Sequence, residues 1–487
     1  MTLPGPVVLI GLPLAVSIVL QILRRWTAIT ASLATLTALL GGLLVASSPL
    51  IDMVLPLSGI TIALEEPLDI LGRVLVIEPV DRLPLIFIFF TAAGLFVIAW
   101  RLLPHSNFFP VGLMMVAMLA GAMMLKQVVY TALLVEIAAV LAVFPLHEPV
   151  GGRYGGGSGK GGARYIAYVT LALPGLMITQ LLLELFALFP NDTALLQSAT
   201  ILLGLSFAIL LGAVPFQAWL STVATDGSPP VATFLFTVNM GAVWFMLLAY
   251  LESYSWLGQQ AVFGPLFTTV GLLMMIIGGS LAAAQRRLGR LIGYATLVDN
   301  GAMFMALGTR QIAGVALTVM MLMARPLALG LMTMGLDGLK RLSGGNDSIG
   351  NNASASIMSL EGAGWRAPWR AVAFVVGGIA MAGFPLSLNF AAHWGLYRVI
   401  AETSLFQAVL ALMGCAGVMM GVIGVARTLF APLPKTAAQE SPTSGKREDL
   451  VVLVLIIVLI GVTLAFGVFP GAISEIALQM AEGFTFF

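Results

Sequence analysis

The chain has 487 residues, of which 59% are hydrophobic and only 9% are charged, and its formal net charge is +1. Soluble domains carry about 25% charged residues, so this composition excludes an ordinary soluble domain, and the near-neutral charge gives no indication of a nucleic acid partner. The single cysteine, Cys415, excludes an internal disulfide and lies in an apolar run, where we expect a small core residue. The three histidines are scattered along the chain, so we expect no metal, haem or other cofactor bound by this chain.

Apolar runs of about 20 residues recur from one end of the chain to the other, and each is long enough to cross about 30 Å of hydrocarbon. The sequence therefore predicts an all-α polytopic membrane protein with fourteen transmembrane helices. In chain order, the predicted spans are 4–24, 26–47, 81–103, 108–125, 127–146, 164–188, 195–213, 230–251, 262–284, 290–308, 311–336, 368–398, 404–430 and 449–476.

The first run, Pro4–Leu23, has no basic residue before it and is followed by Arg24 and Arg25. A cleaved signal peptide has the reverse arrangement of charge, so we expect a retained first helix with its N-terminus outside. This orientation places most basic residues on the cytoplasmic side, as the positive-inside rule requires, and an even number of spans puts the C-terminus outside as well. The outer side receives Arg73, Arg82, Lys126, Arg310 and Arg398.

Three connections between the predicted spans have compositions of their own. Residues 48–80 contain the β-branched runs Ile60–Leu64 and Val74–Ile77 with an acidic, glycine-bearing turn between them, which predicts a short β-hairpin on the outer side. Residues 151–162 are rich in glycine and predict a flexible linker, because no Ser or Thr follows Lys160 as a phosphate-binding loop would require. The polar residues 342–366 predict a surface loop.

Prolines interrupt two of the predicted spans. The segment Val214–Leu220 contains Pro215 and is followed closely by Pro229 and Pro230, and a similar interruption contains Pro385. A helix loses backbone hydrogen bonds at such prolines, and inside a bilayer these bonds must be recovered from protein or trapped water. Each interruption is therefore either a plain loop or a discontinuous helix that lines a polar path.

Ionisable side chains inside membrane spans are costly and so are candidates for function. Glu136 lies in the middle of a span, where it either pairs with a cation on a neighbouring helix or carries protons. Asp299 lies near the start of its span and is either interfacial or functional. Arg325 keeps its proton and suits an electrostatic anchor for water or a carboxylate. His393, two turns after Pro385, either exchanges protons near neutral pH or is a hydrogen-bonded core histidine.

Isolated acidic and basic groups on successive spans, together with two broken helices, are typical of proton conduction. Neighbouring charges shift one another's pKa values, and trapped water bridges the gaps between them. The sequence contains no nucleophile constellation, no redox-cofactor motif and no nucleotide motif. We therefore expect no chemical reaction to be catalysed by this chain on its own.

Five segments occur in the order in which one family of membrane proteins has them. They are Ala163–Tyr165, Val214–Leu220, Ser228–Thr233, Arg287–Gly301 and Ala382–Phe390. On these segments the sequence resembles the antiporter-like membrane subunits of proton-pumping NADH:quinone oxidoreductase (respiratory complex I). Multisubunit sodium/proton antiporters and membrane-bound hydrogenases share this family. The resemblance runs from about Asp81 to about Arg398.

The resemblance implies two inverted five-helix repeats, formed by spans four to eight and nine to thirteen, with broken helices seven and twelve. The chain then divides into five parts. Residues 1–80 form the first two helices and the outer hairpin, and residues 81–107 form the third helix. The two repeats are 108–252 and 262–430, and residues 449–487 form the C-terminal helix and tail.

The resemblance also implies a proton path along the membrane. Glu136 matches the glutamate of span five, and Arg325 falls near the cation of span eleven. His393 falls on the charge of span twelve, and Asp299 stands where a histidine is usual. Two positions depart from the family pattern. Leu210 stands where the family has the lysine of span seven, and Asn239 stands where it has the lysine of span eight.

The function implied is that of an N-type or M-type membrane-arm subunit of a proton-translocating NADH:quinone oxidoreductase, with no redox chemistry in this chain. The implied partners are other membrane-arm subunits, the lipid bilayer, protons and internal water, in a bacterial-type inner membrane. Two alternatives stay open. The chain is a degenerate scaffold that does not pump, or it belongs to a multisubunit cation/proton antiporter or a membrane-bound hydrogenase.

Overall fold

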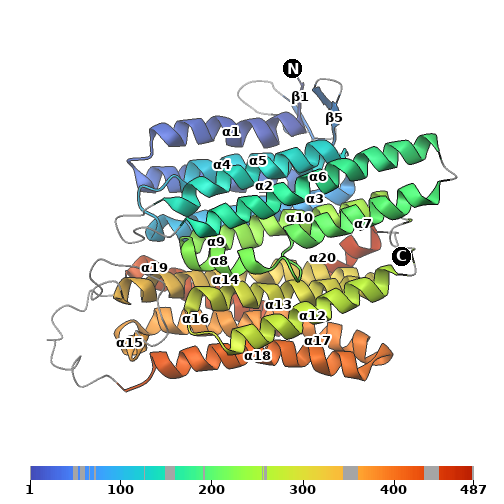
Figure 1. The fold of residues 1–487 in the computed structure, drawn as a ribbon. Coiled ribbons are helices and arrows are strands. Elements are labelled where there is room, and N and C mark those ends of the chain that lie inside the picture. Colours follow the sequence, from blue (N-terminus) through green and yellow to red (C-terminus); the bar gives the residue numbers. More distant parts are fainter. Residues whose placement is uncertain are drawn as a thin grey trace. The chain divides into compact units, whose positions relative to one another are not determined.

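The structure is a computed structural model, and almost all of the chain that it describes is helical (Figure 1). The predicted linker up to residue 158 and most of the predicted 342–366 loop lie outside the described residues. The described residues are 2–47, 53–54, 61–64, 66–70, 73–125, 127–148, 159–189, 192–254, 256, 260, 262–343, 360–432 and 449–484.

The helices follow the predicted spans in order. The first part of the chain forms α1 (Gly5–Ile22), α2 (Thr27–Ser47), α3 (Pro79–Leu102), α4 (Phe108–Met124), α5 (Val128–His147), α6 (Lys160–Leu188) and α7 (Thr193–Leu210). The middle part forms α8 (Ala218–Asp226), α9 (Pro229–Phe234), the π-helix η1 (Leu235–Asn239) and α10 (Met240–Ser253). The last part forms α12 (Phe263–Ala283), α13 (Leu288–Gly308), α14 (Ile312–Ser343), α15 (Ala363–Arg366), α16 (Pro368–Met381), α17 (Leu388–Thr403), α18 (Leu405–Leu429), α19 (Leu450–Val468) and α20 (Gly471–Glu482).

The membrane class is confirmed by the length and hydropathy of these helices. Among the described residues, 12 helices are long and apolar enough to cross a membrane. Two shorter apolar helices, Phe108–Met124 and Pro368–Met381, lie at the predicted fourth and twelfth spans. The count of fourteen and the inverted repeats stay predictions.

Both proline-bearing interruptions are breaks within a helix and not plain loops. The first separates α7 from α8 and contains Pro215, and the second separates α16 from α17 and contains Pro385. Each break begins with a glycine in the left-handed region, Gly212 at φ 65° and Gly383 at φ 68°. Glycine takes this conformation without the steric penalty that a Cβ brings, so it suits the end of a helix that stops abruptly. Pro229 and Pro230 open α9, where a missing N–H costs no helical hydrogen bond.

Short strands lie before α1 and between α2 and α3, but their partners differ from the prediction. The strands are β1 (Thr2–Pro4), β2 (Met53–Val54), β3 (Thr61–Ala63), β4 (Leu68–Ile70) and β5 (Arg73–Leu75). The two predicted β-branched runs correspond to β3 and β5. β3 pairs in parallel with β1 and antiparallel with β2, whereas β5 forms its hairpin with β4. Closing the short β4–β5 connection costs less chain entropy than closing a longer one, which favours the local partner.

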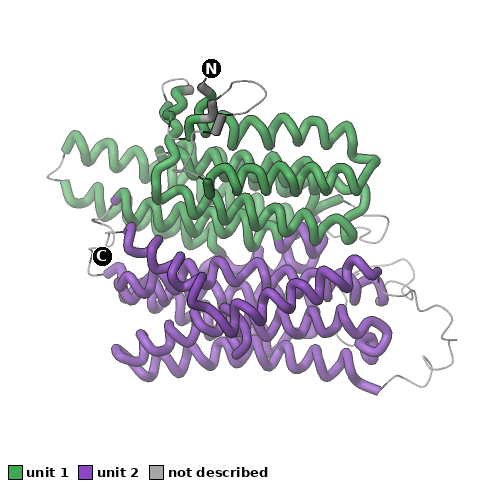
Figure 2. The backbone as a smooth tube through the Cα atoms, turned by 180° about the vertical axis from the view of Figure 1, so that it is seen from behind, with its two compact units in different colours: residues 1–148, 162–211, 234–253 green, residues 149–161, 212–233, 254–487 purple. Residues whose placement is uncertain are grey.

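The chain divides into two compact units (Figure 2). Unit 1 comprises Met1–Glu148, Gly162–Leu211 and Phe234–Ser253, and unit 2 comprises the remainder. The first break and α8 therefore belong to unit 2, where α8 packs on α13. Glycine on α13 permits this close approach, since a Cβ at Gly293 would lie 2.8 Å from the Cα of Ser221.

Glycines also bring α12 close to its neighbours within unit 2. A Cβ added at Gly301 of α13 would lie 2.7 Å from the carbonyl oxygen of Gly271 on α12. A Cβ at Gly279 would collide with the backbone of Gly414 on α18. Small residues let membrane helices approach closely and gain van der Waals contact where lipid provides no hydrophobic driving force. These contacts hold α13 and α18 in the helix group that carries the ionisable residues of unit 2.

Candidate functional site

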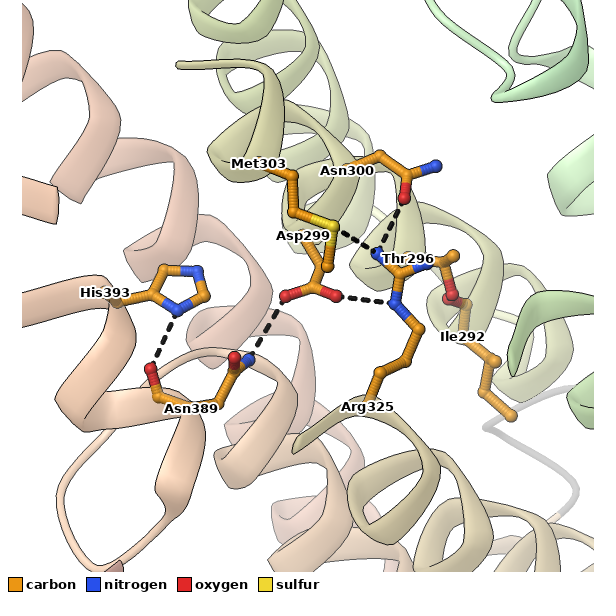
Figure 3. Close-up of polar contacts among 8 residues, drawn as sticks. All are labelled: Ile292, Thr296, Asp299, Asn300, Met303, Arg325, Asn389 and His393. Atoms are coloured by element: carbon orange, nitrogen blue, oxygen red, sulfur yellow. Dashed lines mark hydrogen bonds and ion pairs between the residues drawn. The ribbon is translucent and has the colours of Figure 1, made fainter. Parts of the chain in front are cut away.

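Four polar side chains from three helices of unit 2 meet in the protein interior (Figure 3). Asp299 lies on α13, Arg325 on α14, and Asn389 and His393 on α17, which follows the second break. Their side chains are almost completely buried, with exposed fractions of 0%, 1%, 1% and 0% in that order. We call these four residues the buried polar cluster.

An ion pair forms the centre of the buried polar cluster. The Nε of Arg325 donates to Asp299 Oδ2 at 2.7 Å, and the Nδ2 of Asn389 donates to Asp299 Oδ1 at 3.2 Å. Both carboxylate oxygens are therefore hydrogen-bonded, and one carboxylate connects α13 to α14 and α17. A buried ion pair offsets the cost of leaving water only if its remaining donors and acceptors are also satisfied.

Further contacts on α13 satisfy the arginine. The Nη2 of Arg325 donates to Asn300 Oδ1 at 2.6 Å and approaches the sulfur of Met303 at 3.4 Å. Asp299 and Met303 are one helical turn apart, so they face the guanidinium from the same side of α13. The hydroxyl of Thr296 instead donates to the carbonyl of Ile292 in its own helix at 2.9 Å. The helix α13 therefore supplies a carboxylate, an amide and a thioether to a single cation.

The imidazole of His393 has one nitrogen fixed and one nitrogen available. Its Nδ1 lies 2.9 Å from the backbone carbonyl of Asn389. A carbonyl only accepts hydrogen bonds, so Nδ1 carries a hydrogen, and Nε2 is the nitrogen that can gain or lose a proton. Nε2 has no hydrogen-bond partner among the described residues. The ring lies against the second break, because a Cβ at Gly383 would be 2.7 Å from His393 Cγ.

Glu136 belongs to unit 1, where a neutral side chain donates a hydrogen bond to its carboxylate. Its Oε1 accepts a hydrogen bond from Thr170 Oγ1 on α6 at 2.5 Å, and its Oε2 has no hydrogen-bond partner among the described residues. Tyr165, also on α6, lies near enough for its hydroxyl to interact with the charge of Glu136. The Nδ2 of Asn239 donates to that hydroxyl at 2.7 Å. Leu210, at the other lysine position, is buried at the end of α7.

Asn239 occupies the last position of the π-helix η1 within the eighth predicted span. A π-turn contains one extra residue, which shifts the side chains that follow around the helix axis and often marks a functional site. The sequence gives no clear signal for this turn. Asn239 and Tyr165 therefore form a neutral hydrogen-bonded pair at a position where the resemblance led us to expect a lysine.

The structure brings three of the four predicted proton-path residues together and leaves the fourth apart. Asp299, Arg325 and His393 form one cluster, whereas Glu136 lies in the other unit. Asn389 is not among the predicted residues, although an amide one turn before a histidine inside an apolar span is a usable signal. Among the described residues, no group of three or more His, Cys, Asp or Glu side chains is placed to hold a metal ion.

The model of one protein family matches residues 164–420 of this chain, and the description of that family is "NADH:quinone oxidoreductase/Mrp antiporter, TM". The matched segment contains the buried polar cluster, both breaks and η1. This match confirms the resemblance inferred from the five sequence segments.

Two curated relatives carry the name NADH-quinone oxidoreductase subunit N. The protein from Chromohalobacter salexigens is 28% identical over 286 residues, which cover 58% of this chain and 57% of that protein. The protein from Rhodococcus opacus is 25% identical over 316 residues, which cover 65% of this chain and 55% of that protein. The chain thus aligns with little more than half the length of these relatives.

Solved structures share the fold over nearly the whole chain. A chain of the Mrp complex from Dietzia sp. superposes with a TM-score of 0.78 at 15% identity, covering 99% of this chain and 97% of that chain. A chain of respiratory complex I from Thermus thermophilus gives a TM-score of 0.67 at 17% identity, covering 95% of this chain and 98% of that chain. At such identities the similarity establishes the fold alone.

Proposed function

The chain belongs to the NADH:quinone oxidoreductase/Mrp antiporter transmembrane family, and we propose that it is an antiporter-like membrane-arm subunit that translocates protons in a complex-I-type NADH:quinone oxidoreductase. The observation that carries this proposal is the buried polar cluster beside the second helix break. A carboxylate, a guanidinium and an imidazole are costly inside a membrane protein, and a chain that served only as a scaffold would gain nothing from a titratable group there.

In this proposal the buried polar cluster divides its tasks among its members. Arg325 and Asp299 form an ion pair, and the pair together carries no net charge. His393 is the member that gains and loses a proton, at Nε2. Asn389 links the carboxylate to α17 and also accepts the Nδ1 hydrogen of His393 through its backbone. The proton thus moves on and off the imidazole while the ion pair beside it stays fixed.

The first half of the proposed path differs because Glu136 has no lysine partner at Leu210 or Asn239. We propose that protons reach Glu136 through water and through the hydroxyls of Thr170 and Tyr165, which contact or approach its carboxylate. Without a cation that approaches and withdraws, Glu136 lacks the charge-driven switch that the family pattern implies.

Partners, orientation and cofactors belong to the same proposal. The chain packs among other membrane-arm subunits in a bacterial-type inner membrane, with both termini on the outer side. It binds no redox cofactor, and electron transfer takes place in other subunits of the complex.

Two alternatives have support of their own. Leu210 and Asn239 favour a degenerate scaffold, because both remove a charge from the family path. The structural similarity to an Mrp complex keeps a cation/proton antiporter open. Reading frames for quinone-site and iron–sulfur subunits beside this one would exclude the antiporter alternative.

Substitution of the two titrating residues tests the proposal. We expect Glu136→Gln and His393→Ala each to lower the number of protons pumped per electron in the assembled complex, because each removes a group that carries a proton. The measurement is proton uptake in vesicles during NADH oxidation, with assembly checked on native gels. Unchanged pumping in both variants would establish the scaffold.

A matched control is available on α6. Glu184 is an exposed carboxylate that accepts a hydrogen bond from Gln180 at 2.9 Å within its own helix. Glu184→Gln removes the same charge as Glu136→Gln from the same unit. We expect it to leave pumping unchanged, so that a general effect of lost carboxylates can be distinguished from loss of the path.

A further inference from the structure

The short helix α15 and the last turn of α18 meet at one end of unit 2, away from the buried polar cluster (Figure 1). The backbone N–H of Gly362 donates to the Thr428 carbonyl at 3.1 Å, and a Cβ at Gly364 would lie 2.7 Å from the Leu429 carbonyl oxygen. The segment that contains α15 therefore runs directly beside the end of α18. Four exposed side chains surround this contact, and we call them the basic end patch: Trp365, Arg366, Trp369 and Arg427.

The two arginines of the basic end patch have no ion-pair partner among the described residues. Arg366 ends α15, and Arg427 lies in the last turn of α18. Their neighbour Arg370 is turned inward, with its Nη1 3.5 Å from Asp337 Oδ2, and Arg341 Nε lies 2.8 Å from the same oxygen. Two cations thus neutralise the buried carboxylate, so it does not offset the charge of Arg366 and Arg427.

Acidic groups are scarce around the basic end patch. Residues 360–370 and 405–432 contain three arginines and one acidic residue, Glu361. Glu361 is exposed and forms no ion pair with a described residue. The surface is therefore positive overall and suits an anion. Guanidinium groups in particular bind phosphate oxygens through pairs of parallel hydrogen bonds.

The two tryptophans indicate the depth of the basic end patch in the membrane. Trp365 is 61% exposed and Trp369 is 42% exposed. The Nε1 of Trp365 donates to the Ala431 carbonyl at 3.2 Å, and its ring lies edge-on to Phe430 with the centroids 5.7 Å apart. This indole is thus held in place although most of it is uncovered. Exposed tryptophans at the ends of membrane helices gather at the level of the lipid headgroups, so the two arginines lie level with lipid phosphates.

An exposed apolar face of α18 leads directly to Arg427. Met413 and Met420 precede Arg427 by fourteen and seven residues, which places the three side chains on one face of the helix. The two methionines are 63% and 64% exposed, and Ile423, one turn before Arg427, is 46% exposed. Met420 lies about 10 Å from Arg427 along the helix axis, a distance within the reach of one acyl chain. A cation for a headgroup and an apolar track for a chain are therefore in line.

We propose that the basic end patch binds an acidic phospholipid, with its phosphate on Arg366 and Arg427 and one acyl chain along Ile423 and Met420. Basic pockets between membrane helices are suited to such headgroups. A zwitterionic lipid fits less well, because it brings a cation close to the two arginines. A lipid is favoured over a protein neighbour because the apolar track continues from the arginines into the hydrocarbon. The site uses contacts within unit 2 and does not depend on proton translocation.

Photo-crosslinking tests lipid binding in the assembled protein. The chain is purified with the subunits that it retains, in detergent micelles that contain a phosphatidylglycerol with a diazirine near its glycerol. We expect mass spectrometry to find label on residues 360–370 and 420–432. Unlabelled phosphatidylglycerol should compete for this label, whereas phosphatidylcholine and free glycerol phosphate should not.

Three results of this experiment would overturn the proposal. Equal competition by phosphatidylcholine would show that the site does not select acidic lipids. Competition by free glycerol phosphate would show that it takes a soluble phosphate and needs no acyl chain. An absence of label on both segments would show that a protein neighbour covers the basic end patch.

Substitutions of the arginines test which side chains bind the lipid. We expect Arg366→Gln and Arg427→Gln each to weaken the apparent affinity for the probe about fivefold, because each removes one charge beside the headgroup. Arg427→Lys keeps the charge and should keep most of the affinity. Both arginines are exposed, so we expect the variants to fold and assemble, which native gels would check.

A matched control is available at the end of α1. Arg25 is an exposed arginine beside the exposed Trp26, on the side that we place in the cytoplasm. Arg25→Gln should leave the label on residues 360–370 unchanged. Wild-type affinity in both Arg366→Gln and Arg427→Gln would overturn the proposal. Unchanged pumping in Glu136→Gln together with normal lipid labelling would instead count against the proposed function alone.

Discussion

At the scale of single residues, the buried polar cluster combines a fixed ion pair with a movable proton. Arg325 has three acceptors on α13, the carboxylate of Asp299, the amide of Asn300 and the sulfur of Met303. These contacts offset much of the cost of desolvating the guanidinium. The pair is therefore stable only as a unit, and removal of either partner leaves the other charge buried alone.

A double substitution tests this dependence. Arg325→Gln leaves the Asp299 carboxylate buried without its cation, and we expect a loss of about 3–5 kcal/mol in the free energy of unfolding. Adding Asp299→Asn removes the unpaired charge and should recover most of that loss. Thermal denaturation of the purified protein in detergent would measure both, with the exposed Arg286→Gln as a control. A double variant as unstable as Arg325→Gln would show that the ion pair does not govern stability.

The ionisable members of this cluster could be predicted because a charge inside an apolar run is conspicuous. The pairing of Asp299 with Arg325 could not be predicted, since these residues are 26 positions apart and lie on two different helices. Asn389 was missed for a different reason. Its amide is uncharged and therefore less conspicuous in an apolar span than an ionisable group, and only the fold shows that it donates to Asp299.

At the scale of helices, the two breaks share a left-handed glycine but differ in what lies beside it. The position of a Cβ at Gly383 is 2.7 Å from the His393 ring, whereas the nearest atom to a Cβ at Gly212 is the Leu220 Cδ1 at 2.9 Å. A leucine methyl can rotate away, but an imidazole held by its Nδ1 hydrogen bond cannot move without breaking that bond.

Alanine substitutions should separate the two breaks. Both variants place a Cβ in the left-handed region, at a cost of about 1 kcal/mol or more. We expect Gly383→Ala to lower proton pumping more than Gly212→Ala does, because only the former displaces the proton-exchanging imidazole. Vesicle pumping normalised to assembled complex measures the difference. An equal loss in both variants would mean that backbone strain alone is responsible.

Hydropathy and the positions of the prolines predicted the helices and both breaks, since a membrane leaves the backbone few alternatives. The π-helix η1 was not predicted, because one inserted residue in a helix has no distinctive composition. The strand partners of β3 and β5 were not predicted either. Pairing in such short strands depends on connection length and on which neighbour is available, and the residue types in both runs are alike.

At the scale of the whole molecule, each of the two units is built from segments that are not consecutive in the chain. Residues 212–233 pack with unit 2 although the helix before them belongs to unit 1. Close packing of α8 on α13 fixes this assignment, through contacts such as that of Gly293 with Ser221. Such pairings between distant segments leave no local trace in a single sequence.

The predicted orientation can be checked on unit 2 alone. In a Cys415→Ala background, Gln285→Cys lies at the end of α12 that we place in the cytoplasm, and Gln311→Cys lies before α14 on the side that we place outside. A membrane-impermeant maleimide added to intact cells should label Gln311→Cys and spare Gln285→Cys. Inverted vesicles should give the reverse result, and the opposite pattern in both preparations would invert the topology.

The contact between Gly383 and the His393 ring makes occupancy of the proton site and the shape of the second break thermodynamically reciprocal. If the shape of the break changes the proton affinity of His393 by some factor, binding of a proton changes the equilibrium between shapes by the same factor. A neighbouring subunit that pressed on α16 or α17 would thus act as an effector of proton binding, and a transmembrane pH gradient would act back on that subunit. Energy could then pass in either direction across one glycine–imidazole contact.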